Sequence, residues 1–177
     1  TKPDLITFAK AVTNGYQPLG GVMVSDRIAE VITSQGGEFG HGFTYSGHPA
    51  ACAAALATLH IMARDNIQQN VKNHLAPHFQ AGWQALADHP IVGHVRGLGM
   101  FGSIELVGNK QSGERLGKDS EAGATCRQAC LDNGLVMRAV GDSMIIAPPL
   151  VCSTQDIDEL LRRAIAALDA TAAHFGV

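Results

Sequence analysis

Lys10 is the residue of this sequence whose type and position best fit covalent chemistry. It follows Asp4–Ala9, a mostly apolar segment that predicts a short buried strand of the parallel type, and it precedes the glycine-rich turn Asn14–Gly21. A lysine at such a junction is partly desolvated, which favours the neutral and nucleophilic amine. Amines of this kind attack carbonyl carbons. The alternative, from this segment alone, is a lysine that extends from a strand end into solvent.

A second candidate is the loop Gly36–Pro49, which contains five glycines and leads into a long helical pattern. Glycines let backbone amides approach an anion, and the amino end of a helix favours negative charge. Thr44 and Ser46 add hydroxyl groups, so the loop could hold a phosphate, although no GK[ST] follows and it is not a Walker loop. The alternative is an ordinary connection in which Ser46 caps the helix and Pro49 lies in its first turn.

Arg138 is the third candidate, because it lies on a short predicted strand, Leu135–Ala139, beside a turn. A planar guanidinium at this position could hold a substrate carboxylate through two parallel hydrogen bonds. The alternatives are an ion pair with Asp142 or a solvated arginine at a sheet edge.

Periodic patterns predict the elements that must position these residues. An apolar stripe at i, i+4 spacing predicts a long helix over residues 66–88, in which Pro77 can introduce a kink. Residues from about 67 onward alternate short strands and helices and predict a small α+β domain. The other predicted helices are 26–34, 50–65, 120–133 and a terminal one opened by a capping box at Ser153–Asp156, and the other predicted strands are 91–96, 100–107 and 144–147.

Composition excludes several classes of protein. The chain has 177 residues, 46% of them hydrophobic and 16% charged, with a net charge of −3, so we expect a real core, no nucleic-acid partner and no membrane association. Four scattered cysteines predict free, mostly buried thiols and a reducing, cytoplasmic environment. His41 and His48 have no ligand spacing, so we expect no metal site.

Four segments taken together resemble a known family. Pro3–Ser25 resembles the cofactor-lysine segment of fold-type I, class III pyridoxal-phosphate-dependent aminotransferases, and His41–Leu56 is similar to the phosphate-contact segment downstream of it. Val95–Leu106 and Leu135–Leu150 look like the family's small domain, in the right order. The likeness covers essentially the whole chain and is closest to the ω-transaminase branch, the amine and β-alanine:pyruvate type.

The resemblance implies an α/β fold in which residues 1–66 end the large cofactor-binding domain and residues 67–177 form the small carboxy-terminal domain. It implies that Lys10 forms the internal aldimine with pyridoxal 5'-phosphate and then acts as general base and acid of the 1,3-proton shift. Thr44 and the Phe43 amide would hold the phosphate of the partner subunit's cofactor. Arg138 would receive the carboxylate of an amino or keto acid, and would swing away for a plain amine.

The function implied is transfer of an amino group between an amine or ω-amino acid and a keto acid such as pyruvate, in a homodimer or tetramer whose site is shared across the interface. An aminomutase, a decarboxylating transaminase or a non-catalytic partner domain are the alternatives. The family's aspartate for the pyridine nitrogen, its glycine-serine segment and its stacking aromatic lie upstream of the lysine. We therefore expect a carboxy-terminal portion of a longer enzyme, and 177 residues that alone do not bind the cofactor tightly.

Overall fold

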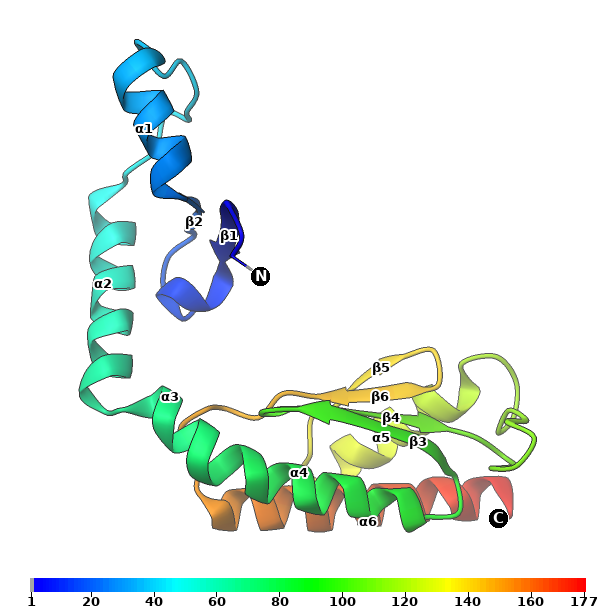
Figure 1. Cartoon of the computed structure of the whole chain (residues 1–177). Helices are drawn as coiled ribbons and strands as arrows, with labels where there is room; N and C mark the ends of the chain where they lie inside the picture. Colours follow the sequence, from blue (N-terminus) through cyan, green and yellow to red (C-terminus); the bar gives the residue numbers. More distant parts are fainter. Residues whose placement is uncertain (1) are drawn as a thin grey trace. The chain divides into compact units, whose positions relative to one another are not determined.

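The computed structural model describes residues 2–177, and the chain divides between Asn66 and Ile67 into two compact units. Each unit is described by itself (Figure 1). Within residues 2–177, none of the helices combines the length and the apolar character that a membrane crossing requires.

The first unit begins with a two-stranded sheet. Strand β1 (Leu5–Ala9) pairs with β2 (Gly20–Val24), and the 3₁₀ turn Lys10–Thr13 and the loop after it reverse the chain between them. The pairing is antiparallel, with Leu5 opposite Val24 and Ala9 opposite Gly20. The prediction of a buried strand of the parallel type is therefore wrong in both respects, since all five residues of β1 are exposed within this chain. The reversal has a local cause: Asn14 and Gly15 both adopt positive φ angles, of 51° and 81°.

Two helices complete the first unit. Helix α1 (Asp26–Gln35) follows β2 directly, and helix α2 (Pro49–Arg64) follows the glycine-rich loop. Pro49 occupies the first turn of α2, as expected, because its missing N–H group is not needed there. His48, rather than Ser46, is the residue that precedes the helix, and it makes no side-chain capping bond.

The second unit opens with a helix that changes its winding. A short α-helical segment, α3 (Ile67–Asn70), passes through a π-helical turn (Val71–Leu75) into α4 (Ala76–Ala85), and a 3₁₀ turn (Leu86–Asp88) ends it. Pro77 has no N–H group to donate to the residue four positions earlier. In the widened turn, the Ala76 amide reaches back to the Val71 carbonyl instead. The irregularity expected at Pro77 is thus a π-turn just before it.

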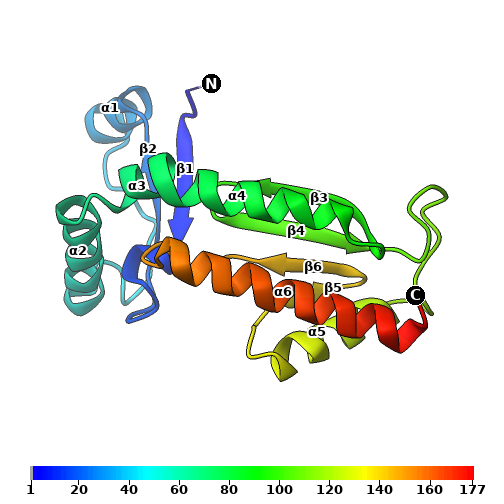
Figure 2. The ribbon, with the colours of Figure 1, turned by 90° about the horizontal axis from the view of Figure 1, so that it is seen from below.

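A four-stranded antiparallel sheet forms the centre of the second unit. Its strands lie in the order β3 (Val92–Leu98), β4 (Phe101–Leu106), β6 (Ser143–Ile146) and β5 (Arg138–Val140). Helices α4, α5 (Glu121–Asp132) and α6 (Thr154–Phe175) cover one face, as Figures 1 and 2 show. The core lies between that face and the helices. Its largest fully buried side chains are those of Trp83, Phe79, Ile91, Ile104, Leu106, Met144, Ile157 and Leu168.

Helix ends are fixed by hydrogen bonds that the sequence predicted in part. The capping box before α6 is present: the Asp156 amide donates to Ser153 Oγ, and the Ser153 amide donates to the Asp156 carboxylate. Helix α5 ends at a Schellman motif, in which Gly134 has a φ of 69° and the Leu135 amide donates to the Cys130 carbonyl at 2.8 Å. Arg163 of α6 donates to the Gly134 carbonyl at 2.8 Å, which ties the end of α5 to α6.

Gly102 of β4 lies in close contact with helix α4. A Cβ atom at this position would lie 2.5 Å from Cε2 and 2.6 Å from Nε1 of Trp83. Since Trp83 is fully buried and its ring stacks on Phe79 at a centroid distance of 5.4 Å, the indole cannot move aside. Glycine at position 102 is therefore what lets β4 lie flat on α4.

Candidate active site

Lys10 lies at the carboxyl end of β1, on the first residue of the 3₁₀ turn. Its φ is 57°, in the left-handed region that non-glycine residues rarely adopt. Such a conformation costs about 1–2 kcal/mol and persists only where neighbouring structure imposes it. Strained backbone of this kind is often found at functional sites, and Lys10 shares it with three other non-glycine residues of the described chain, Asn14, Asn66 and Ser120.

The neighbouring structure that imposes this geometry is a buried hydroxyl. Thr13 is 1% exposed, and its Oγ1 donates to the Gln17 carbonyl at 2.5 Å while lying 3.5 Å from the Lys10 carbonyl oxygen. One threonine therefore fixes both sides of the turn. The Lys10 side chain itself is exposed, and within residues 2–177 its amine has no hydrogen-bond or ion-pair partner. The expected desolvation of Lys10 is thus not provided by residues 2–177.

A second set of bonds closes the other end of the hairpin. The Ser25 amide donates to the Asp4 carbonyl at 2.8 Å, and Ser25 Oγ donates to the Asp4 carboxylate at 2.9 Å. Arg27 forms an ion pair with the same carboxylate at 2.8 Å. The ion pair is exposed and Ser25 is only partly buried, so the bonds contribute modestly to stability, but they support the register that brings Lys10 to the end of β1.

The glycine-rich loop presents Phe43 and Thr44 to solvent. The Phe43 amide donates to Ser46 Oγ at 2.8 Å, and the Ser46 amide donates to the Phe43 carbonyl at 3.0 Å. The Phe43 amide, expected to contact a phosphate, is therefore occupied by Ser46 in this structure. The Thr44 hydroxyl makes no hydrogen bond within residues 2–177, so it is available to a ligand.

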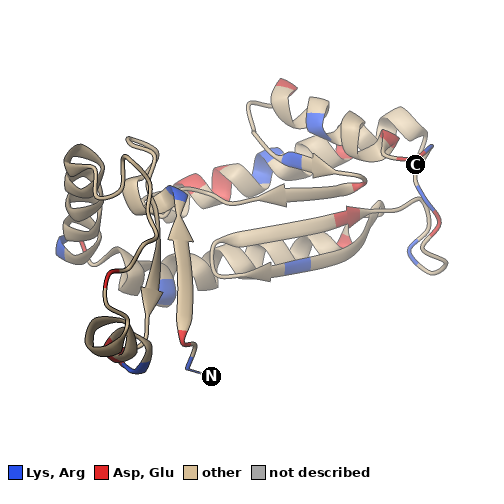
Figure 3. Ribbon diagram, turned by 90° about the horizontal axis from the view of Figure 1, so that it is seen from above, with Lys and Arg blue, Asp and Glu red and all other residues tan. Residues whose placement is uncertain are grey.

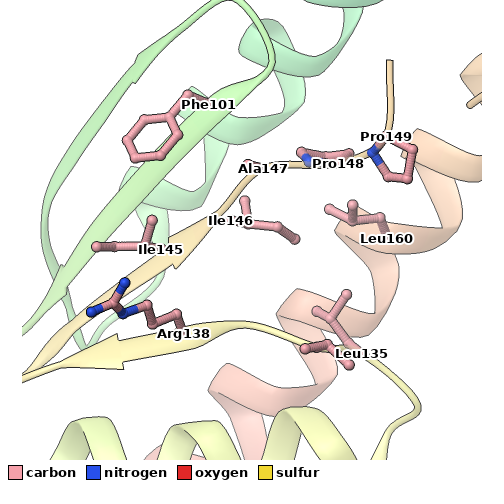
Figure 4. A pocket seen from close by; sticks show the side chains of 10 residues that line it. Phe101, Leu135, Arg138, Ile145, Ile146, Ala147, Pro148, Pro149 and Leu160 are labelled. Atoms are coloured by element: carbon pink, nitrogen blue, oxygen red, sulfur yellow. The ribbon is translucent and has the colours of Figure 1, made fainter. Parts of the chain in front are cut away.

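Arg138 belongs to the second unit, where it is exposed on the first residue of β5. The alternative of an ion pair with Asp142 is wrong: Asp142 accepts a hydrogen bond from the Gly123 amide at 3.1 Å, and no carboxylate among residues 2–177 lies within ion-pair distance of Arg138. The guanidinium lies beside Ile145, at an open pocket of about 590 Å³ (Figure 4).

That pocket is apolar apart from Arg138. It lies at the end of β6, where Arg138 and Ile145 on the open face of the sheet approach Leu160 of α6 (Figure 4). Figure 3 views the open face, where charged positions are sparse along the strands. An isolated cation in an apolar pocket is suited to a ligand with one carboxylate and a small apolar body. The other residues that line it are Phe101, Leu135, Val136, Ile145, Ile146, Ala147, Pro148, Pro149 and Leu160.

The structure assigns Lys10, Phe43 and Thr44 to the first unit and Arg138 to the second. Within residues 2–66, no hydrogen bond joins Lys10 to Phe43 or Thr44. Sequence reasoning missed Arg96 and Ser103, which line a second pocket on the same sheet face as Arg138. Alternation along each strand could have indicated their faces, but only the strand register shows that they share a row with Arg138.

Comparison with known proteins identifies what these features are similar to. The family model for aminotransferase class-III matches residues 1–168. The chain is 54% identical over 171 residues to the putrescine–pyruvate aminotransferase of Pseudomonas aeruginosa, covering 97% of this chain and 37% of that protein. It is 42% identical over 164 residues to the mitochondrial gamma aminobutyrate transaminase 1 of Solanum lycopersicum, covering 91% and 32%.

Solved structures agree with the relatives. The crystal structure of the omega transaminase from Pseudomonas jessenii in complex with PMP matches with a TM-score of 0.91 and 31% identity, over 99% of this chain and 39% of that one. The expected fold class, that of the fold-type I pyridoxal-phosphate transferases, is thereby confirmed. The chain spans about a third of the length of the relatives it matches.

Proposed function

The chain belongs to the class III aminotransferases, and from this premise we propose that it serves a transaminase that moves an amino group from an amine or ω-amino acid to a keto acid such as pyruvate. The observation that carries the proposal is Lys10: an exposed amine without a partner among residues 2–177, held at a strained backbone position by buried Thr13. Two relatives that act on amino compounds, named above, support the same class of reaction.

We infer that the cofactor is pyridoxal 5'-phosphate and that its contacts come in part from this chain. The donor set fits this group, since Lys10 offers a free amine and Thr44 a free hydroxyl at a glycine-rich loop. The chemistry that the cofactor supplies when bound is that of an electron sink. Lys10 Nζ would hold it covalently and, once released, would carry a proton between two carbon atoms of the substrate adduct.

Thr44 is proposed to hold the phosphate through its hydroxyl, together with the Phe43 amide. For the amide to take part, Ser46 Oγ must release it; the serine O–H group, which only accepts in this contact, can itself donate to the phosphate. We propose that these residues serve the partner subunit's cofactor in a homodimer or tetramer. Residues 1–66 would then belong to the large cofactor-binding domain and residues 67–177 to the small domain.

Arg138 is proposed to hold the carboxylate of the amino or keto acid. Its guanidinium has no carboxylate partner within residues 2–177, and the apolar wall beside it suits the methyl group of pyruvate. For a plain amine the long side chain would turn away to solvent. A cytoplasmic location is part of the proposal, and it is supported by the four free thiols of Cys52, Cys126, Cys130 and Cys152.

The test is borohydride reduction of the cofactor-loaded enzyme that carries this chain, followed by peptide mapping. A pyridoxyl group on Lys10, and none in the Lys10→Ala enzyme, is the expected result. Label on another lysine, or no label in cofactor-saturated protein, would favour a non-catalytic partner domain instead. Formation of alanine from pyruvate with an amine donor then separates the transaminase from an aminomutase or a decarboxylating enzyme.

A further inference from the structure

Thr13 is the one polar side chain among the buried residues of the first unit. Within residues 2–66 the other buried residues are Ala51 and Ala55, which lie one turn apart on α2. A buried hydroxyl gives up its hydrogen bonds to water, so valine, which has almost the same shape, would be favoured here unless the hydroxyl has acceptors in the protein. A threonine at this position therefore indicates a role for the hydroxyl group itself.

Thr13 closes two consecutive turns with two different groups. Its hydroxyl donates to the Gln17 carbonyl at 2.5 Å and lies 3.5 Å from the Lys10 carbonyl oxygen. Its own carbonyl accepts a hydrogen bond from the Tyr16 amide at 3.1 Å, across a turn whose two central residues both have positive φ angles, as a type I′ turn requires. The backbone from Lys10 to Gln17 is thus held by one residue.

Helix α2 packs against the 3₁₀ turn that contains Thr13 (Figures 1 and 2). The two buried residues of the helix are alanines, whose small side chains let a helix approach a turn closely. The turn is therefore supported from outside its own loop by a helix of 16 residues. The same helix follows the glycine-rich loop that carries Thr44, so it borders both the proposed phosphate contact and the support of Lys10.

Lys10 is the residue that this arrangement holds against its own preference. A φ of 57° lowers the population of a lysine conformation by about 5- to 30-fold relative to an ordinary one. If φ relaxed to a negative value, the side chain would leave the backbone in another direction and its amine would move. Proton transfer requires the amine within hydrogen-bond reach of the reacting atoms, so the backbone conformation of Lys10 should set the rate of its reaction.

We propose that Thr13 is a positioning residue for the reaction of Lys10. Its hydroxyl, on a turn supported by α2, holds Lys10 in the left-handed conformation from which the amine reaches the cofactor and the substrate. The inference rests on the proposed function, because Thr13 acts through the amine that carries that function. The Thr13 side chain is enclosed by this chain and cannot contact the substrate, so its effect should fall on the chemical step and not on substrate binding.

The first test compares hydrogen exchange of backbone amides in the cofactor-free, full-length enzyme that carries this chain. Thr13→Val removes the hydroxyl and keeps the shape, so the Asn14 and Tyr16 amides, which close the two turns, should exchange about 5- to 30-fold faster. Thr13→Ser keeps the hydroxyl and should leave exchange within about twofold of wild type. Thr33→Val is the matched control: the exposed Thr33 hydroxyl donates to the Ala29 carbonyl at 2.9 Å in α1, so its loss should leave both turns unchanged.

The second test is the rate at which borohydride-trapped pyridoxyl label appears on Lys10 at saturating pyridoxal 5'-phosphate. Thr13→Val should lower this rate and kcat by about 5- to 30-fold, and it should leave the KM for pyruvate within about twofold of wild type. Thr13→Ser should restore both rates, whereas a general loss of folding would lower binding and turnover together.

Wild-type labelling and turnover in Thr13→Val would overturn the inference and leave the proposed function standing. Losses that Thr13→Ser does not restore would overturn it too, because they would come from the shape of the side chain and not from its hydroxyl. Absence of label on Lys10 in the wild-type enzyme would instead refute the proposed function. The exchange rates would then still decide whether the Thr13 hydroxyl holds the backbone of Lys10.

Discussion

Substitution of Gly102 by alanine tests the central packing contact of the second unit. The new Cβ atom would lie 2.5–2.9 Å from three atoms of the Trp83 indole, where carbon atoms in contact are ordinarily about 3.5–4.0 Å apart. Trp83 is fully buried and stacked on Phe79, so β4 rather than the ring must move, by about 1 Å. Overpacking of this size costs about 1–3 kcal/mol.

The assay is urea-induced equilibrium unfolding of the full chain, with Trp83→Phe as the second member of a double-mutant cycle. Phenylalanine is smaller than the indole and leaves space into which its ring can shift away from the new methyl group, so the cost of Gly102→Ala should fall in that background. We expect a coupling free energy of about 1–2 kcal/mol between the two sites. Trp83→Phe also removes an indole N–H that is buried without a partner in the described residues, which reduces its own cost.

Gly40→Ala is the control. A Cβ atom there meets nothing within 4 Å, and Gly40 does not have a positive φ, so the free energy of unfolding should change by less than about 0.5 kcal/mol. Additive effects of Gly102→Ala and Trp83→Phe, or a Gly102→Ala chain as stable as the wild type, would refute the reasoning.

Two further predictions concern charged side chains. Hydrogen bonds from Arg162, and to a smaller extent from Arg163, lower the pKa of Glu159 to about 2, from an ordinary value of 4.5. Because the ionised carboxylate is favoured in the folded state, these bonds stabilise the fold above pH 4.5, and the stabilisation is lost as the pH falls towards 2. Urea unfolding should therefore find Glu159→Gln less stable than wild type at pH 7 and equal to it near pH 2, and a difference that persists at pH 2 would contradict this. Arg138→Gln should raise the KM for pyruvate roughly 10- to 100-fold and leave the KM for a plain amine nearly unchanged. Steady-state kinetics in which both KM values rise by the same factor would exclude the carboxylate-binding role of Arg138.

Local sequence patterns were sufficient to predict many of the helices and strands. The stripe that includes Leu75, Phe79 and Trp83 is buried as the i, i+4 spacing predicted, and the capping box at Ser153 is present. These features depend on residues within one or two helical turns of each other, so their physics is contained in a short window of sequence. Ile165 departs from the apolar periodicity of the terminal helix, since its side chain is 44% exposed.

The sequence by itself also indicated the family, because the four segments that carry the resemblance are local motifs, and it proposed Lys10, Thr44 and Arg138 as site residues. Only the tertiary structure decided the strained φ of Lys10, the hydrogen bond that occupies the Phe43 amide, and the absence of an ion pair between Arg138 and Asp142. It alone brought Arg96 into one row with Arg138, 42 positions further along the chain. Strand order and register are set by packing of the whole sheet against its helices, and no local pattern in either segment contains that information.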